Sequence, residues 1–192
     1  MYNGTNPSAL RSREWLCSAM LDLLKLRKFD EITIKDVCRE ADLSRQTFYQ
    51  IFESKEEIIE YHFGELFSEF RVRCAGFDCI TLTELTIQFF TFFSQQADFI
   101  QVLTENNMSY VLERQFERYL PEIGLFQRIN ETEAFPDYTV SYVAGALCQI
   151  LIHWYEKGMD LSVNQIASMT EQLITGKHLR GDGHVLSQLD RR

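Results

Sequence analysis

The chain has 192 residues, of which 45% are hydrophobic and three are proline. This composition excludes disordered and fibrous proteins and allows one or two domains with a buried core. The net charge of −9 argues against a protein that coats nucleic acid. Residues 1–55 nevertheless hold nine Lys and Arg against eight Asp and Glu, whereas residues 56–192 hold ten against twenty. The acidic excess therefore lies outside the N-terminal quarter of the chain.

The sequence predicts a cytoplasmic protein without a cofactor. The first residues are polar, unlike a signal peptide, and no apolar run reaches the roughly 18 residues that a membrane span needs. The five cysteines are odd in number, which suits reduced thiols. Cys74 and Cys79 do not have the spacing of a zinc site, so we expect no metal. Phosphate-binding and nucleophile motifs are also missing, and we expect no enzyme.

The first predicted helices form a compact N-terminal group. A helix over about residues 8–28 is indicated by apolar residues at helical spacing, and residues 29–32 connect it to the next helix. Thr33 can cap a short helix that Ala41 closes, and Asp42 suits a tight turn because Asp tolerates left-handed backbone. Ser44 can then cap a second short helix. Two short helices joined by a tight turn are typical of a helix-turn-helix.

The second short helix has one apolar side and one polar side. Phe48, Ile51 and Phe52 form the apolar side, which leaves a polar surface suited to reading base edges in a major groove. Tyr49 and Lys55 suit phosphate contacts instead. Thr33 and Ser44 can add phosphate bonds, although capping explains them fully. The DNA-binding residues predicted in this way are Thr33, Ser44, Arg45, Gln46, Thr47, Tyr49, Gln50 and Lys55.

The rest of the chain is predicted to be helical. Ser54 and Glu57 form a capping box at the start of a long helix, which should end near residues 76–80. Helices over 82–95, 98–104 and 107–128 follow, the last bent or split by Pro121 and Gly124. Pro136 can open a helix to Lys157, and a final helix should run from Ser162 to Gly176. No alternating strand pattern occurs, so we predict an all-α fold of about nine helices.

Two stretches resemble a known family. Residues 32–41 and 43–57, with the motifs Thr-Phe-Tyr-x-x-Phe and Ser-Lys-Glu, resemble the helix-turn-helix of TetR-family transcriptional regulators. The family often has Gly where this chain has Asp42, and His where it has Ile51. Residues 106–110 and 142–159 are similar to the C-terminal domain of one TetR branch, which includes regulators of dihydroxyacetone kinase operons. The expected domains are a helix-turn-helix domain over 8–54, a regulatory and dimerisation domain over 55–176, and a tail over 177–192.

The resemblance implies a dimer and an effector pocket in the C-terminal domain. The predicted dimer interface is an apolar stripe on the last two helices: Val140, Val143, Ala144, Gly145, Leu147, Leu151, Trp154, Ile166, Met169 and Leu173. An intrachain core explains the same stripe. The predicted effector pocket is aromatic: Phe89, Phe93, Tyr110, Phe116 and Tyr142. Aromatic residues at helical spacing equally fit an ordinary core.

We therefore expect a homodimeric repressor that binds a palindromic operator in double-stranded DNA and is released by a small apolar or aromatic effector. In the alternative, the C-terminal domain responds to a protein partner, and the regulator activates transcription. An all-helical enzyme would need convergent titratable groups. Glu105, His153 and Glu156 are the only candidates, and nothing in the sequence links them.

Overall fold

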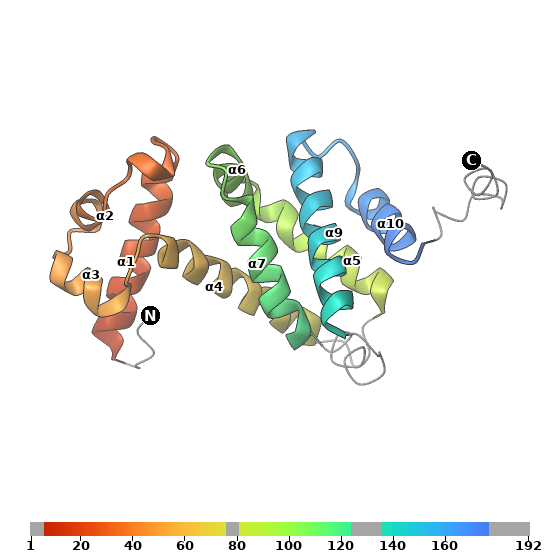
Figure 1. Ribbon diagram of the computed structural model, residues 1–192, viewed down its shortest axis with the longest axis horizontal. Coiled ribbons are helices and arrows are strands. Elements are labelled where there is room, and N and C mark those ends of the chain that lie inside the picture. Colours follow the sequence, from red (N-terminus) through yellow and green to blue (C-terminus); the bar gives the residue numbers. More distant parts are fainter. Residues whose placement is uncertain (1–5, 76–80, 124–135, 177–192) are drawn as a thin grey trace, which may run out of the picture. The chain divides into compact units, whose positions relative to one another are not determined.

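The computed structural model describes residues 6–75, 81–123 and 136–176 (Figure 1). All regular structure in these residues is helical, as predicted. Among the described helices, none combines the length and the apolar character that crossing a bilayer requires. The chain divides into two compact units, one of residues 1–69 and 98–115, the other of residues 70–97 and 116–192.

In the first unit, α1 (Pro7–Leu24) begins with Asn6 as its cap and buries Leu16, Met20 and Leu23. The prediction that this helix extends to Lys28 is wrong. It stops at Leu24, and Leu26, which continues the helical spacing of the apolar residues, is 81% exposed. The short 3-10 helix η1 (Phe29–Glu31) follows and buries Phe29 instead.

The two short helices are α2 (Ile34–Glu40) and α3 (Arg45–Ile51). Thr33 caps α2 in a reciprocal box, because its hydroxyl accepts from the Asp36 amide at 3.2 Å and its backbone amide donates to the Asp36 carboxylate at 3.0 Å. Hydrogen bonds from Thr33, with Arg27 and Arg39 nearby, lower the pKa of Asp36 to about 2. The start of α2 is thus fixed by local polar chemistry.

The long helix α4 is Glu56–Ala75, and residues 76–80, where its end was predicted, lie outside the described residues. The predicted capping box is half formed. The Glu57 amide donates to Ser54 Oγ at 3.3 Å, but the Glu57 carboxylate accepts from the Glu53 amide at 3.0 Å. The first unit also includes α6 (Ala97–Glu105) and most of α7 (Ser109–Tyr119).

The helix predicted over 107–128 is shorter than expected. α7 ends at Tyr119, and Pro121 lies in the 3-10 helix η3 (Leu120–Glu122), since proline lacks the amide hydrogen that a continuing α-helix needs. Residues 124–128 lie outside the described residues.

The second unit contains α5 (Leu82–Phe93), η2 (Ser94–Gln96), α9 (Pro136–Glu156) and α10 (Val163–Ile174). Its core is a cluster of phenylalanine rings. The Phe89 ring lies 4.7 Å from Phe93 and 5.3 Å from Phe116, and its side chain is fully buried. Tilted ring contacts of this kind add to the stabilisation from burying aromatic area.

We expect Phe89→Ala to lower the free energy of unfolding by about 3–5 kcal/mol, because it leaves a cavity among packed rings. Val72→Ala is the control, since Val72 is 68% exposed on α4 and its loss should change stability by less than about 0.5 kcal/mol. Urea unfolding followed by circular dichroism measures both. Equal stability of the two variants would contradict this description of the core.

Candidate nucleic-acid interface

The turn between α2 and α3 fixes the angle between the two helices. Asp42 has a φ of 51°, the left-handed conformation predicted for it. The next amide, of Leu43, donates to the Cys38 carbonyl at 2.9 Å and closes the end of α2. Ser44 then caps α3 by accepting from the Thr47 amide at 3.0 Å. An aspartate therefore performs the backbone role for which the TetR family often uses glycine.

Helix α3 is held by its apolar side. Phe48 is fully buried, and Ile51 and Phe52 are 3% and 1% exposed. The other side of the helix carries polar and aromatic side chains that remain in solvent, with Thr47 half-buried: Arg45, Gln46, Tyr49 and Gln50 are exposed. A helix with an exposed polar side and a fixed buried side can enter a major groove without unfolding.

Three of the predicted contact residues already have local hydrogen bonds. The Thr33 hydroxyl is used in the α2 cap, and Ser44 Oγ lies 2.9 Å from Thr47 Oγ1. Arg45 is exposed but interacts with Tyr49: its guanidinium carbon lies 5.9 Å from the centre of the Tyr49 ring, and a side-chain hydrogen bond with Tyr49 raises the pKa of Arg45. Arg45, Gln46 and Gln50 are thus the exposed side chains of α3 that could reach bases and that the helix caps do not use.

Lys55 lies at the start of α4, as predicted, but its ammonium is bonded within the first unit. Its ammonium donates to the carbonyls of Phe29 at 2.6 Å and Ile32 at 3.0 Å, and it lies 4.1 Å from the centre of the Phe29 ring. Two of its three N–H donors are therefore used inside the first unit. Lys55 ties the start of α4 to the segment between α1 and α2, which makes its main role structural.

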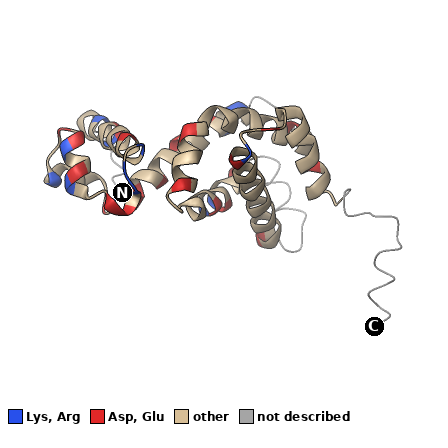
Figure 2. Ribbon diagram, turned by 90° about the horizontal axis from the view of Figure 1, so that it is seen from above, with Lys and Arg blue, Asp and Glu red and all other residues tan. Residues whose placement is uncertain are grey.

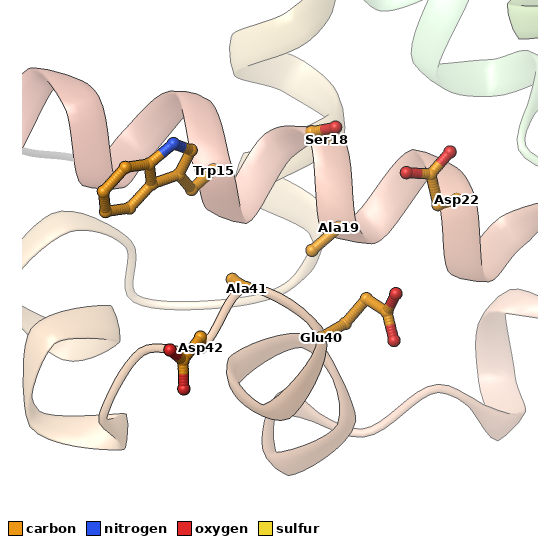
Figure 3. Close-up of a pocket in the computed structure, with 7 residues that line it drawn as sticks. All are labelled: Trp15, Ser18, Ala19, Asp22, Glu40, Ala41 and Asp42. Carbon is orange, nitrogen blue, oxygen red and sulfur yellow. The ribbon is translucent and has the colours of Figure 1, made fainter.

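The charges around α3 are mixed: α3 itself carries only Arg45, whereas basic and acidic residues are interspersed over α1 and α2 (Figure 2). A cleft of about 360 Å³ lies between α1 and the end of α2 (Figure 3). Asp22, Glu40 and Asp42 line it together with Trp15, which is half exposed. Asp22 pairs with Lys25 at 2.9 Å. Carboxylates repel phosphates, so the lining of this cleft is unfavourable for a contact with the DNA backbone.

The predicted effector-pocket residues fall into two groups. Phe89, Phe93 and Phe116 are fully buried and touch one another in the second unit, whereas Tyr110 and Tyr142 are 53% and 56% exposed. None of these five residues lines the α1–α2 cleft or the groove of about 390 Å³ between α9 and α10. Within the described residues, no three His, Cys, Asp or Glu side chains gather in a way that could hold a metal ion.

Most members of the predicted dimer stripe are buried within a single chain, which fits the intrachain core that explains the same stripe: Val140, Val143, Ala144, Leu147, Leu151, Trp154 and Ile166. Gly145, Met169 and Leu173 keep partial exposure. The stripe is thus mainly intrachain core, because α9 uses it to pack inside its own unit.

Two polar residues were missed by the sequence reasoning. The Asn106 side chain accepts from the Phe29 amide at 2.7 Å, and the neighbouring Glu105 carbonyl accepts from Lys28 at 2.8 Å. Both bonds join η1 to the turn between α6 and α7.

Gln115 is 1% exposed on α7, and its amide oxygen has no hydrogen-bond partner. A single amide between Leu112 and Phe116, on the apolar face of a helix, was the available signal.

Comparison with known proteins agrees with this geometry. A family model for bacterial regulatory proteins of the tetR family matches residues 16–61. A second model, for the C-terminal region of transcriptional regulators, matches residues 81–176, which is half of the chain. An all-helical fold with a helix-turn-helix thus defines a DNA-binding transcriptional regulator rather than an enzyme. The chain belongs to the TetR family.

Individual relatives are more distant. The dhaKLM operon transcriptional activator DhaS of Lactococcus lactis is 32% identical over 54 residues, or 28% of this chain and 29% of that protein. A solved structure of a dihydroxyacetone kinase operon activator DhaS covers 88% of this chain and 96% of its own, with a TM-score of 0.55 and 19% identity.

Two further solved structures share the fold. A Listeria innocua protein covers 94% of this chain and 97% of its own, with a TM-score of 0.78 and 14% identity. A TetR regulator from Streptococcus agalactiae covers 87% and 95%, with a TM-score of 0.63 and 19% identity. At these identities the likeness shows the fold alone.

We expect Lys55→Ala to destabilise the protein by about 1–3 kcal/mol, because it leaves two part-buried carbonyls without their charged donor. Lys35→Ala, at an exposed lysine of α2, removes the same charge and should change stability by less than about 0.5 kcal/mol. Thermal and urea unfolding compare the two. If Lys55→Ala unfolds like the wild type and instead flattens the salt dependence of DNA binding, Lys55 is a phosphate contact after all.

Proposed function

We propose that the protein is a homodimeric repressor that binds a palindromic operator through α3. The observation that carries the proposal is the division of α3 into a fully buried apolar side and a free side with Arg45, Gln46 and Gln50. Two copies related by a two-fold axis would present two such helices. Their half-sites would lie one helical turn of DNA, about 34–36 Å, apart or a multiple of it.

Arg45 is proposed as the main base reader. Its planar guanidinium can donate two hydrogen bonds to guanine in the major groove, and it projects from the first turn of α3. Gln46 and Gln50 can read adenine by similar paired bonds. The remaining predicted residues, Thr33, Ser44, Thr47 and Tyr49, are proposed to contribute phosphate contacts or to orient α3.

Two hydrogen bonds support a mechanism by which effector binding in the C-terminal domain changes the position of the DNA-binding helices. Lys28 and Phe29, just before α2, are bonded to Glu105 and Asn106 in the turn between α6 and α7. Asn107, next in that turn, has a φ of 57°, so the turn is tightly defined. A shift of α6 or α7 on effector binding would pull on η1 and change the separation of the two α3 helices.

Gln115 supports an effector with a specific chemistry. A buried amide oxygen without a partner costs about 1–3 kcal/mol, and such groups concentrate at functional positions. The oxygen is an acceptor, so it would be satisfied by a hydroxyl or N–H group of a ligand. We therefore propose an apolar or aromatic effector that carries one such donor.

The protein-partner alternative, with activation of transcription, is favoured by one finding. The partly matching relative and one structural neighbour are both named as activators. Deleting the gene and measuring transcription of neighbouring operons separates the two roles. Higher transcription supports the repressor, and lower transcription supports the activator.

For DNA reading, we expect Arg45→Ala to weaken operator binding by about 1–3 kcal/mol per half-site and to relax preference at one base position. Arg71→Ala removes one positive charge from the second unit and should leave that preference intact. Competition binding against an operator library measures both variants. If preference is unchanged in Arg45→Ala, then Arg45 does not read bases, and Gln46 or Gln50 takes that role.

For the effector, we expect Gln115→Leu to raise the free energy of unfolding by up to about 1–3 kcal/mol while abolishing the response to ligand. Thermal shift with a panel of phenols and aromatic amines, beside their methyl analogues, tests the donor requirement. Gln101→Leu, at an exposed glutamine of α6, should change neither property. Destabilisation by Gln115→Leu would mean that the amide is structural, and this support for the effector would be lost.

A further inference from the structure

Tyr49 lies on the exposed side of α3, one helical turn after Arg45. Its side chain is 51% exposed, although large aromatic side chains are mostly covered in folded proteins. Residues at this spacing are neighbours on a helix surface, so the two side chains share one side of α3. The guanidinium carbon of Arg45 lies 5.9 Å from the centre of the Tyr49 ring. The pair therefore belongs to the side of α3 that the proposed function assigns to DNA.

The Tyr49 ring is itself held by the core of the first unit. It packs against the Phe48 ring in a T-shaped contact, with the two centres 5.4 Å apart and the planes at 84°. Phe48 is fully buried and also lies against Phe52. A tyrosine has few side-chain torsions, and one that rests against a buried ring has few alternative positions. Tyr49 thus offers Arg45 a rigid partner.

The hydroxyl of Tyr49 contributes more to this contact than the face of its ring. The distance of 5.9 Å is close to the limit of about 6 Å within which a cation is attracted to an aromatic face. In addition, a side-chain hydrogen bond with Tyr49 raises the pKa of Arg45. A guanidinium only donates, so the tyrosine oxygen is the acceptor. The other N–H groups of Arg45 remain available for a base.

This partner leaves the positive charge of Arg45 available to DNA. The ion pairs printed on α2 join Asp36 to Arg27 and Arg39, and among the described residues no carboxylate lies within ion-pair distance of Arg45. A carboxylate would compete with DNA for the guanidinium, whereas a neutral hydroxyl orients it without neutralising it. A cation in the first turn of a helix is also unfavourable for the helix dipole, so the stability of α3 does not explain this arginine.

We propose that Tyr49 is a positioning residue, which holds the Arg45 guanidinium in the orientation that reads a base. The inference rests on the proposed reading of DNA by Arg45 and names the residue that orients it beforehand. Fixing one long side chain in an interface weakens binding by roughly two- to tenfold, and Tyr49 removes part of that loss before DNA binds. The rival role for the same hydroxyl, a phosphate contact, would act on every DNA sequence alike.

A double-mutant cycle in the full-length protein tests the positioning role. Tyr49→Phe keeps the ring against Phe48 and removes only the hydroxyl. We expect it to reduce the preference at the base position that Arg45→Ala relaxes, by roughly two- to tenfold per half-site, while the affinity for nonspecific DNA stays unchanged. In the Arg45→Ala background the same change should alter that preference by less than about twofold, because the two residues act as one unit.

Tyr119→Phe is the matched control for the loss of a hydroxyl. The guanidinium carbon of Arg118 lies 5.3 Å from the centre of the Tyr119 ring, so the second unit holds a pair of the same kind. This variant should leave the base preference unchanged. Competition binding against an operator library and against nonspecific DNA measures all the variants.

A second measurement needs no DNA. Nitrogen relaxation of the Arg45 Nε–H group, followed by NMR in the DNA-free protein, reports how ordered that side chain is on the picosecond to nanosecond timescale. We expect Arg45 to be more ordered in the wild type than in Tyr49→Phe, and Arg118 to be equally ordered in both. Equal order of Arg45 in the two proteins would overturn the inference.

The outcomes separate this inference from the proposed function. It is supported if Arg45→Ala and Tyr49→Phe relax the same base position. If Tyr49→Phe instead weakens binding to all sequences equally, and by the same factor in both backgrounds, Tyr49 is a phosphate contact. If Tyr49→Phe binds like the wild type, Arg45 needs no positioning residue. In both of these cases reading by Arg45 stands and the inference fails. If Arg45→Ala leaves the preference unchanged, the reading and the inference fail together.

Discussion

The burial of Phe48 and its neighbours Ile51 and Phe52 is the constraint on which the DNA-binding arrangement depends. A helix of seven residues has little stability of its own, so α3 exists because this apolar side packs into the first unit. That packing also sets the rotation of the helix, and the rotation decides which side chains face outward. The burial of Phe48, Ile51 and Phe52 therefore leaves the opposite side of the helix exposed to solvent. That side carries Arg45, Gln46 and Gln50.

Several polar contacts hold the surroundings of α3 in place without using its free side. Asp42 provides the left-handed turn, Ser44 satisfies the first amides of the helix, and Lys55 binds the carbonyls of Phe29 and Ile32. The Phe29 amide also donates a hydrogen bond to the Asn106 side chain, in the turn between α6 and α7. The same short segment is therefore bonded both to the start of α4 and to the turn through which an effector would act.

Much of this arrangement could be predicted from the sequence because it rests on local rules. The Thr33 cap, the Asp42 turn and the buried side of α3 follow from residue type and helical spacing, and all three are present. The resemblance to the TetR family could also be recognised from the sequence, because its motifs in residues 43–57 are contiguous. The end of α1 was predicted four residues too late because Leu26 continues the helical spacing, although the chain buries Phe29 instead.

Long-range contacts set the limit of sequence reasoning. Lys55 was predicted to face DNA because an exposed lysine at a helix start favours anions, but its partners lie 26 and 23 residues earlier in the chain. Likewise, an apolar stripe on α9 fits a dimer interface and an intrachain core equally well, and only the fold shows which contacts the stripe makes. Gln115 has no local signature beyond its type, since burial depends on neighbours far away in the sequence.

The central claim is that the free side of α3, presented twice by a homodimer, reads a symmetric DNA site. Selection of bound fragments from a random DNA library by the purified wild-type protein tests it most directly. The account predicts enrichment of an inverted repeat whose half-sites are centred about one helical turn, or a multiple of it, apart. Enrichment of a single asymmetric site, or no enrichment above the starting library, would contradict it.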